Sequence, residues 1–172
     1  TYEKFRAKSK TVMPEAFSGS EKTLRQLKVL YEDADILIIN KPSGMLSQKA
    51  RPEDVSANEY ILSYLLREGA LTEEEMRTFR PSVCNRLDRN TSGILIAGKT
   101  LKGLQEMSKA LKERTIQKYY RCVAKGEVLR EHYLKGWLVK DERENKVTVS
   151  TVKPKSADAA PIETAYRPIW TG

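Results

Sequence analysis

The sequence predicts an α+β fold with a mixed, mostly antiparallel sheet that is flanked by helices. Short apolar runs rich in β-branched residues are separated by single helical segments, which favours this class. Residues 137–139 and 146–152 flank a charged turn, a pattern typical of a hairpin of antiparallel strands. The regular alternation of strand and helix that a parallel sheet requires is not seen. At 172 residues, the chain is long enough for one domain.

The first part of the chain predicts a polar edge followed by a buried strand. Residues 1–28 hold seven Lys and Arg against three Glu and are interpreted as a linker or domain edge, so the main domain is expected at 29–172. Residues 31–35 are expected to form a turn. The continuous apolar run 36–39 predicts a buried strand. Pro and Gly are expected to end this strand in a loop at 40–44.

Two helices are expected in the next part of the chain. Apolar residues at helical spacing predict a helix over 55–67, and Gly69 is its expected stop. Thr72 and Glu75 have the spacing of a capping box, in which each side chain binds the backbone N–H of the other. This box predicts a short helix that ends near Phe79.

The second half of the domain predicts further strands and one amphipathic helix. Residues 94–97 form a short apolar run that predicts another buried strand. Thr100 is the expected cap of a helix that runs to Leu111, and the apolar stripe of this helix is expected to lie in the core. The composition of residues 115–124 and 162–169 favours two more strands.

The most informative segment precedes the apolar run at 94–97. It reads Asn85-Arg86-Leu87-Asp88-Arg89-Asn90-Thr91-Ser92-Gly93. A positioned, ionised aspartate can act as a nucleophile or a base, and nearby guanidinium groups favour its charged form. The same arginines can bind phosphate oxygens in pairs. A structural salt bridge between Asp88 and Arg86 or Arg89 is the alternative interpretation of this spacing.

The distribution of charge favours a polyanionic partner. The net charge is +8, and residues 99–125 alone hold eight Lys and Arg against two Glu. Such a cluster suits nucleic acid, although a solvated helix face gives the same pattern. Cys84, Cys122 and His132 are too few for a structural zinc site, so no metal is expected. No apolar run reaches 18 residues, so no membrane span is expected.

Four stretches, in order, resemble the RluA-type pseudouridine synthases. Arg-Leu-Asp-Arg-x-Thr-Ser-Gly followed by an apolar strand is similar to the catalytic motif of this family. Residues 36–44 resemble its opening strand and Lys-Pro-x-Gly loop, 100–111 the helix after the motif, and 118–126 its Lys-x-Tyr strand. The resemblance covers about residues 30–170 and implies the pseudouridine synthase fold. It also implies isomerisation of uridine to pseudouridine within RNA, without a cofactor.

The resemblance implies a role for each matching residue. Asp88 is the implied catalytic nucleophile. Tyr120 matches the tyrosine that lies against the flipped uracil and is a candidate for proton removal, with a place in the core as its alternative. Arg86 matches the arginine that enters the RNA and fills the place of the flipped base. Arg89 and Lys41 are expected to bind RNA, with bracing of its own loop as the alternative for Lys41.

Four further motif residues are expected to shape the turn that aims the aspartate, namely Asn85, Thr91, Ser92 and Gly93. Asn85 stands where the family usually has His, and an amide can form hydrogen bonds but cannot titrate. A later family motif, Gly-Lys/Arg-x-His-Gln-Ile-Arg, supplies a basic partner for the aspartate and is not found before Gly172. The chain is therefore interpreted as a fragment of a longer protein.

The expected partner is ribosomal RNA, with the large subunit favoured and tRNA as a further candidate. The protein is expected to be a cytoplasmic monomer. A non-catalytic RNA-binding module or an inactive fragment is the main alternative, because the basic motif is missing. A carboxylate hydrolase is disfavoured, since the usual glycosidase needs two positioned carboxylates and no second acid stands in a comparable motif.

Overall fold

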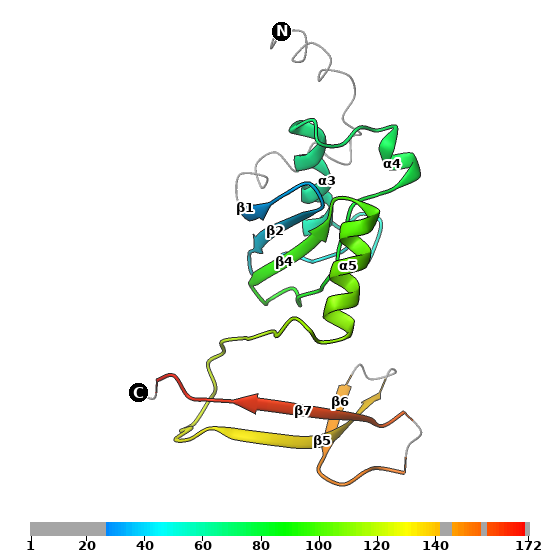
Figure 1. Cartoon of the computed structure of the whole chain (residues 1–172). Coiled ribbons are helices and arrows are strands. Elements are labelled where there is room, and N and C mark those ends of the chain that lie inside the picture. Colours follow the sequence, from blue (N-terminus) through cyan, green and yellow to red (C-terminus); the bar gives the residue numbers. More distant parts are fainter. Residues whose placement is uncertain (1–26, 142–145, 156–157, 171–172) are drawn as a thin grey trace. The chain divides into compact units, whose positions relative to one another are not determined.

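The computed structural model describes residues 27–141, 146–155 and 158–170. The chain divides into two compact units, residues 1–118 and 119–172. Each unit contains one sheet, and all strand pairs in the two sheets are antiparallel (Figure 1). The predicted α+β class is therefore confirmed. Most of the expected N-terminal edge and residues 142–145 of the expected charged turn lie outside the described residues.

The first unit is built on a sheet of four strands in the order β1-β2-β4-β3. Its central pair is β2 (Ile36–Lys41) and β4 (Gly93–Gly98), the two strands that the apolar runs predicted. They pair without interruption from Ile36 opposite Gly98 to Lys41 opposite Gly93. The end of β2 therefore lies beside the start of β4.

The two outer strands of this sheet were not predicted. β1 (Lys28–Glu32) covers residues that were assigned to the N-terminal edge and the following turn, and β3 (Ser82–Val83) lies in a segment that was expected to be loop. Neither strand has a buried apolar run that would reveal it. Both form because the central strands present backbone N–H and C=O groups that an edge strand can pair with.

Helix α3 (Ala57–Arg67) covers one face of this sheet and confirms the predicted helix, although it begins two residues later. Leu37, Ile39 and Leu95 of the sheet pack with buried side chains of α3 such as Ile61 and Leu65 in one core. These strand residues alternate along β2 and β4, as expected for a sheet with one face on the core.

Helix α4 (Glu75–Thr78) is short, as predicted, and its capping box is present. The Thr72 hydroxyl accepts from the backbone N–H of Glu75 at 3.2 Å, and the Glu75 carboxylate accepts from the N–H of Thr72 at 2.8 Å. The box satisfies two N–H groups at the start of a helix that has little packing of its own.

Helix α5 (Leu101–Lys112) begins where predicted, and the Thr100 hydroxyl accepts from the N–H of Gly103 at 3.1 Å. The helix docks closely on the turn between β1 and β2. A Cβ atom at Gly103 would lie 2.1 Å from the carbonyl oxygen of Asp35, so this contact requires glycine. The Asp35 carboxylate accepts from the Thr100 hydroxyl at 2.6 Å and from the Lys102 ammonium at 3.1 Å.

The apolar stripe of α5 does not lie in the core, which corrects the prediction. Leu101 is 54% exposed, and Leu104, Met107 and Leu111 are only half-buried. The core forms instead on the sheet face that α3 covers. In the N-terminal part of α5, the backbone of Leu104 packs closely on Gly98 of β4, where a Cβ atom would lie 2.4 Å from it.

The second unit holds the three remaining strands in the order β6-β5-β7. β5 (His132–Asp141) pairs with β6 (Lys146–Ser150) and with β7 (Ala160–Tyr166), so the predicted hairpin and the predicted last strand are confirmed with shifted bounds. The strand predicted at 115–124 does not form. Its β-forming side chains are not sufficient, because a strand needs a ladder partner, and none of the strands in the described ranges forms a ladder with this segment.

No helix in the described part of the chain is long and apolar enough to cross a membrane.

The contact between Asp35 and α5 predicts a specific acid sensitivity. The hydrogen bond from Thr100 and the bond and charge of Lys102 hold the pKa of the Asp35 carboxyl below its ordinary value of 3.8. The ionised carboxylate therefore stabilises the fold above that value, and this stabilisation is lost as the pH falls through the lowered pKa. We expect Asp35→Asn to reduce the free energy of unfolding at pH 7, and we expect its difference from the parent chain to shrink as the pH falls below 3.8.

Urea unfolding at several pH values measures this difference. Glu73→Gln is a suitable control, because Glu73 is exposed and has no ion pair among the described residues. An Asp35→Asn effect that is the same at pH 3 and pH 7 would contradict the assignment.

Candidate active site

Two loops meet at one end of the central strand pair in the first unit. Because Lys41 pairs with Gly93, the loop that follows β2 and the loop that precedes β4 leave the sheet side by side. The second of these loops carries the Asp88 motif. Gly93 begins β4 with a φ of 131°, a backbone conformation that glycine adopts without strain. The register of β2 against β4 thus places the motif.

Lys41 is fully buried beneath these loops. Its ammonium donates to the carbonyl oxygens of Met45 at 2.7 Å, Pro42 at 3.0 Å and Arg89 at 3.3 Å. Burial lowers the pKa of Lys41, and the negative charge of Asp88 partly opposes this shift. This geometry matches the loop-bracing alternative for Lys41 and leaves its ammonium inaccessible to an RNA phosphate.

Further bonds join the two loops. The Ser43 hydroxyl donates to the carbonyl of Asn90 at 2.9 Å, and the Gly44 N–H donates to the carbonyl of Arg89 at 2.8 Å. Within the motif, the Thr91 N–H donates to the carbonyl of Asp88 at 3.0 Å and closes a turn. Ser92 is exposed and follows this turn. The backbone at Asp88 and on its C-terminal side is therefore held.

Asn85 fixes the other end of the motif through its side chain. Its amide N–H donates to the carbonyl of Ile94 at 3.1 Å, and its amide oxygen accepts from the N–H of Ile96 at 2.8 Å. The preceding residue, Cys84, still pairs through its backbone, with its N–H bonded to the Ile96 carbonyl at 2.7 Å. The Asn85 side chain thus continues the β3–β4 pairing beyond the point where the backbone leaves it.

The reactive groups of the motif face solvent. Asp88, Arg86 and Arg89 are all exposed. Among the described residues, the Asp88 carboxylate has no ion pair within 4.0 Å, so the salt-bridge alternative is not formed here. Hydrogen bonds fix the backbone of the motif, while the carboxylate and both guanidinium groups stay accessible. This arrangement suits groups that contact a large external substrate.

Tyr120 belongs to the second unit and is 63% exposed, which excludes the core alternative in this structure. The strand that was expected to carry it is not formed. Its contact with the substrate base stays a prediction.

Sequence reasoning missed two residues, one in the first turn of α3 that binds strand β3 just before the motif, and one in the preceding loop that binds the motif itself. Asn58 accepts from the Val83 N–H at 2.9 Å through its amide oxygen, and the Ser47 hydroxyl binds the backbone of Leu87. Asn58 stands early in a predicted helix, where a polar residue among apolar ones is a weak signal. Ser47 has no local signal, because its partner lies 40 residues away in the sequence.

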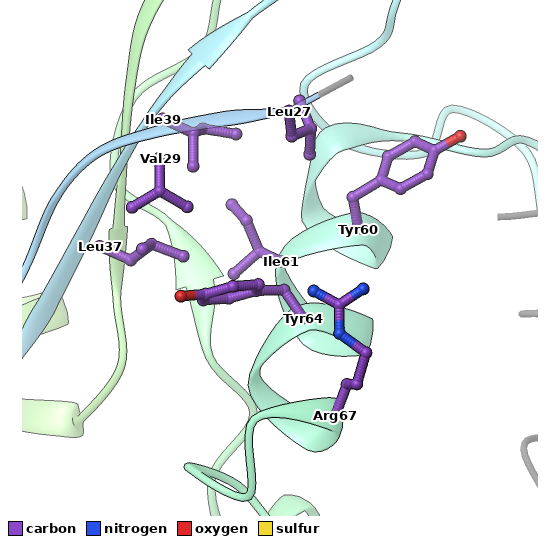
Figure 2. Close-up of a pocket in the computed structure, with 8 residues that line it drawn as sticks. All are labelled: Leu27, Val29, Leu37, Ile39, Tyr60, Ile61, Tyr64 and Arg67. Atoms are coloured by element: carbon purple, nitrogen blue, oxygen red, sulfur yellow. The ribbon is translucent and has the colours of Figure 1, made fainter. Parts of the chain in front are cut away.

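A small pocket lies away from the motif, between strands β1 and β2 and helix α3 (Figure 2). Its volume is about 80 Å³, well below the 300–1,000 Å³ or so of ordinary ligand sites. Figure 2 shows strand side chains such as Leu37 and Ile39 on one side, and α3 residues Tyr64 and Arg67 on the other. We interpret it as a packing gap of the core. None of the motif residues lines it.

No group of three or more His, Cys, Asp and Glu side chains could hold a metal ion in the described ranges.

Comparison with known proteins identifies the family of the chain. The sequence profile of the RNA pseudouridylate synthase family matches residues 35–171. The ribosomal large subunit pseudouridine synthase D of Neisseria meningitidis serogroup B is 30% identical over 127 residues, which cover 74% of this chain and 32% of that protein. An uncharacterized RNA pseudouridine synthase of Mycoplasma genitalium is 30% identical over 126 residues, covering 72% of this chain and 38% of that protein.

A solved structure supports the same fold. Human RNA pseudouridylate synthase domain containing 4 aligns with a TM-score of 0.55 at 14% identity, covering 85% of this chain and 54% of that one. The chain belongs to the RNA pseudouridylate synthase family. It spans about a third of the length of the curated relatives that it matches.

The hydrogen bonds of the Asn85 side chain predict how two substitutions at this position change the free energy of unfolding. Asn85→Ala should lower the free energy of unfolding by about 1–2 kcal/mol, because backbone groups of Ile94 and Ile96 lose their partners. Asn85→Asp keeps the acceptor for Ile96 but sets a carboxylate against the Ile94 carbonyl, so it should destabilise at pH 7 and recover partly when protonated near pH 4.

Urea unfolding at the two pH values tests both variants, with Asn90→Ala in the exposed part of the same loop as control. Equal stability of Asn85→Ala and the control would show that the amide does not hold the motif.

Proposed function

We propose that this chain supplies the catalytic aspartate of an enzyme that isomerises uridine to pseudouridine in ribosomal RNA. Family membership and the large-subunit pseudouridine synthases among its relatives support this proposal. The observation that carries it is the accessible carboxylate of Asp88 on a loop whose backbone is bonded on both sides. We favour RNA of the large ribosomal subunit as the substrate, because several of these relatives are named for it.

In the proposed mechanism, the target uridine leaves the RNA stack before it reacts. Flipping a base costs a few kcal/mol, which contacts with the protein must offset. Arg86 would enter the RNA in place of the flipped base, and Arg89 would bind a neighbouring phosphate through its guanidinium. Tyr120 would stack on the uracil, a contact worth about 1–3 kcal/mol. Asp88 would act as the nucleophile that allows the base to detach, turn and bond through C5.

The fixed backbone of the Asp88 loop supports a catalytic role over a purely structural one. A nucleophile gains most from being held close to its attack geometry before the substrate arrives. Lys41 places a buried positive charge near the carboxylate, whose negative charge acts on the Lys41 pKa. The same ammonium binds the Arg89 carbonyl and so holds the loop that carries the aspartate.

The basic segment that was predicted to bind RNA divides into two groups. Lys99 is bonded to Glu32 at 2.7 Å and to the Asp33 carbonyl at 2.7 Å, so we exclude it from the RNA surface. Lys112 and Arg114, at the end of α5, are exposed and have no ion pair among the described residues. We propose these two side chains as phosphate contacts.

Replacing the proposed nucleophile tests the catalytic proposal. We expect Asp88→Asn to abolish pseudouridine formation in ribosomal RNA while the affinity for RNA stays within a few fold, because the amide keeps the shape of the carboxylate but not its nucleophilic charge. Product is measured by chemical mapping of pseudouridine, and affinity by filter binding. Asp54→Asn, in a separate loop, is the matched control.

Unchanged turnover of Asp88→Asn would eliminate Asp88 as nucleophile. RNA binding by the parent chain without any product would favour the alternative of a non-catalytic RNA-binding module.

The salt dependence of binding tests the phosphate contacts. The logarithm of the RNA affinity should fall steeply with the logarithm of the salt concentration, because bound Lys and Arg release counterions. Replacing Lys112 and Arg114 together with Gln should make this slope shallower by about 1.4 for single-stranded RNA. Lys28→Gln, in β1, is the control, and an unchanged slope in the double variant would remove the end of α5 from the RNA surface.

A further inference from the structure

We propose that Ser47 is a positioning residue, which fixes Asp88 by holding the backbone of Leu87. This inference rests on the proposed function, since it assigns the purpose of the contact to the catalytic aspartate. The contact itself is part of the first unit and does not depend on the RNA.

The hydroxyl of Ser47 makes two bonds to one residue of the motif. It donates to the carbonyl oxygen of Leu87 at 2.7 Å and accepts from the N–H of Leu87 at 2.9 Å. The Ser47 residue is 3% exposed, so these bonds are shielded from water. Both backbone groups of Leu87 are thus satisfied by a single side-chain atom. An adjacent strand would otherwise have to supply a donor and an acceptor.

Ser47 is itself held by the start of α3. Its carbonyl accepts from the N–H of Asn58 at 3.2 Å, and the carbonyl of Leu46 accepts from the N–H of Ala57 at 2.8 Å. Leu46 also forms an isolated parallel bridge with Ser56. The hydroxyl therefore projects from backbone that is hydrogen-bonded to a helix of the core. Its bonds to Leu87 hold the motif against this fixed backbone.

Leu87 lies between the two reactive side chains of the motif, so fixing Leu87 also restricts where they can point. Its side chain is buried in the core at 9% exposure, while Arg86 and Asp88 on either side are exposed. With both its side chain and its backbone fixed, Leu87 determines the direction in which the Asp88 side chain leaves the loop. The bonds to the carbonyl of Arg89 then hold the other flank of Asp88.

The chemistry requires a hydroxyl at position 47. A hydroxyl offers a donor and acceptor lone pairs on one atom, whereas a methyl group offers neither and a thiol only weak forms of both. Ser47→Ala and Ser47→Cys therefore weaken the link to Leu87 without adding bulk beyond one sulfur atom. Ser63→Ala is the matched control, because Ser63 is also buried and its hydroxyl has no hydrogen-bond partner in the described structure.

Two measurements on the full chain test the inference. Hydrogen exchange should show the Leu87 amide exchanging about tenfold faster or more in Ser47→Ala, relative to the Leu95 amide of β4, which reports on the core. In pseudouridine formation, kcat should fall by about 10–100-fold in Ser47→Ala while KM for RNA stays within about twofold, because a small misplacement of a catalytic group affects the chemical step. The exchange rate of Leu87 and the kcat of Ser47→Cys should lie between those of Ser47→Ala and those of the parent chain.

The outcomes separate this inference from the proposed function. Unchanged relative exchange of Leu87, or an equal loss of kcat in Ser63→Ala, would overturn the role of Ser47. Faster exchange of Leu87 together with unchanged kcat would also overturn it, because the bonds from Ser47 to Leu87 would then have no effect on catalysis by Asp88. A parent chain that makes no pseudouridine would count against the proposed function, while the exchange of Leu87 would still report whether Ser47 holds the loop.

Discussion

The buried ammonium of Lys41 is the interaction on which the candidate site depends. A cation removed from water costs several kcal/mol unless polar groups replace its hydration shell. Here the replacements are three carbonyl oxygens, two from the loop that follows β2 and one from Arg89 of the motif. Separation of the two loops would therefore take the Arg89 carbonyl away from the ammonium. The negative charge of Asp88 partly opposes the lowering of the Lys41 pKa by burial.

Around this charge, side chains replace backbone pairing at two points. The Asn85 amide continues the pairing with β4, and the Ser47 hydroxyl binds both backbone groups of Leu87. A strand in this position would be rigid, but its reactive side chains would lie against its neighbours. A loop held by side chains is comparably fixed and still leaves Asp88 exposed, which the proposed reaction on RNA requires.

The local patterns in the sequence predicted the elements that local forces determine. Strands β2 and β4 have buried apolar runs, α3 and α5 have helical spacing, and α4 has a capping box. The outer strands β1 and β3 were missed because they exist only as partners of strands already in place. Residues 115–124 show the opposite error, since their β-forming composition led to no ladder with any described strand.

The sequence by itself determined the family, the motif and the reactive residue types, because these depend on the identity and order of neighbouring residues. It also left two roles open for Lys41. Only the tertiary structure decided between them, by burying the ammonium among carbonyls that belong to separate parts of the chain. The structure likewise showed that Ser47 binds Leu87 of the motif and that Asn58 binds strand β3 just before it. Such contacts arise from the packing of α3 against the sheet, and no spacing along the chain encodes them.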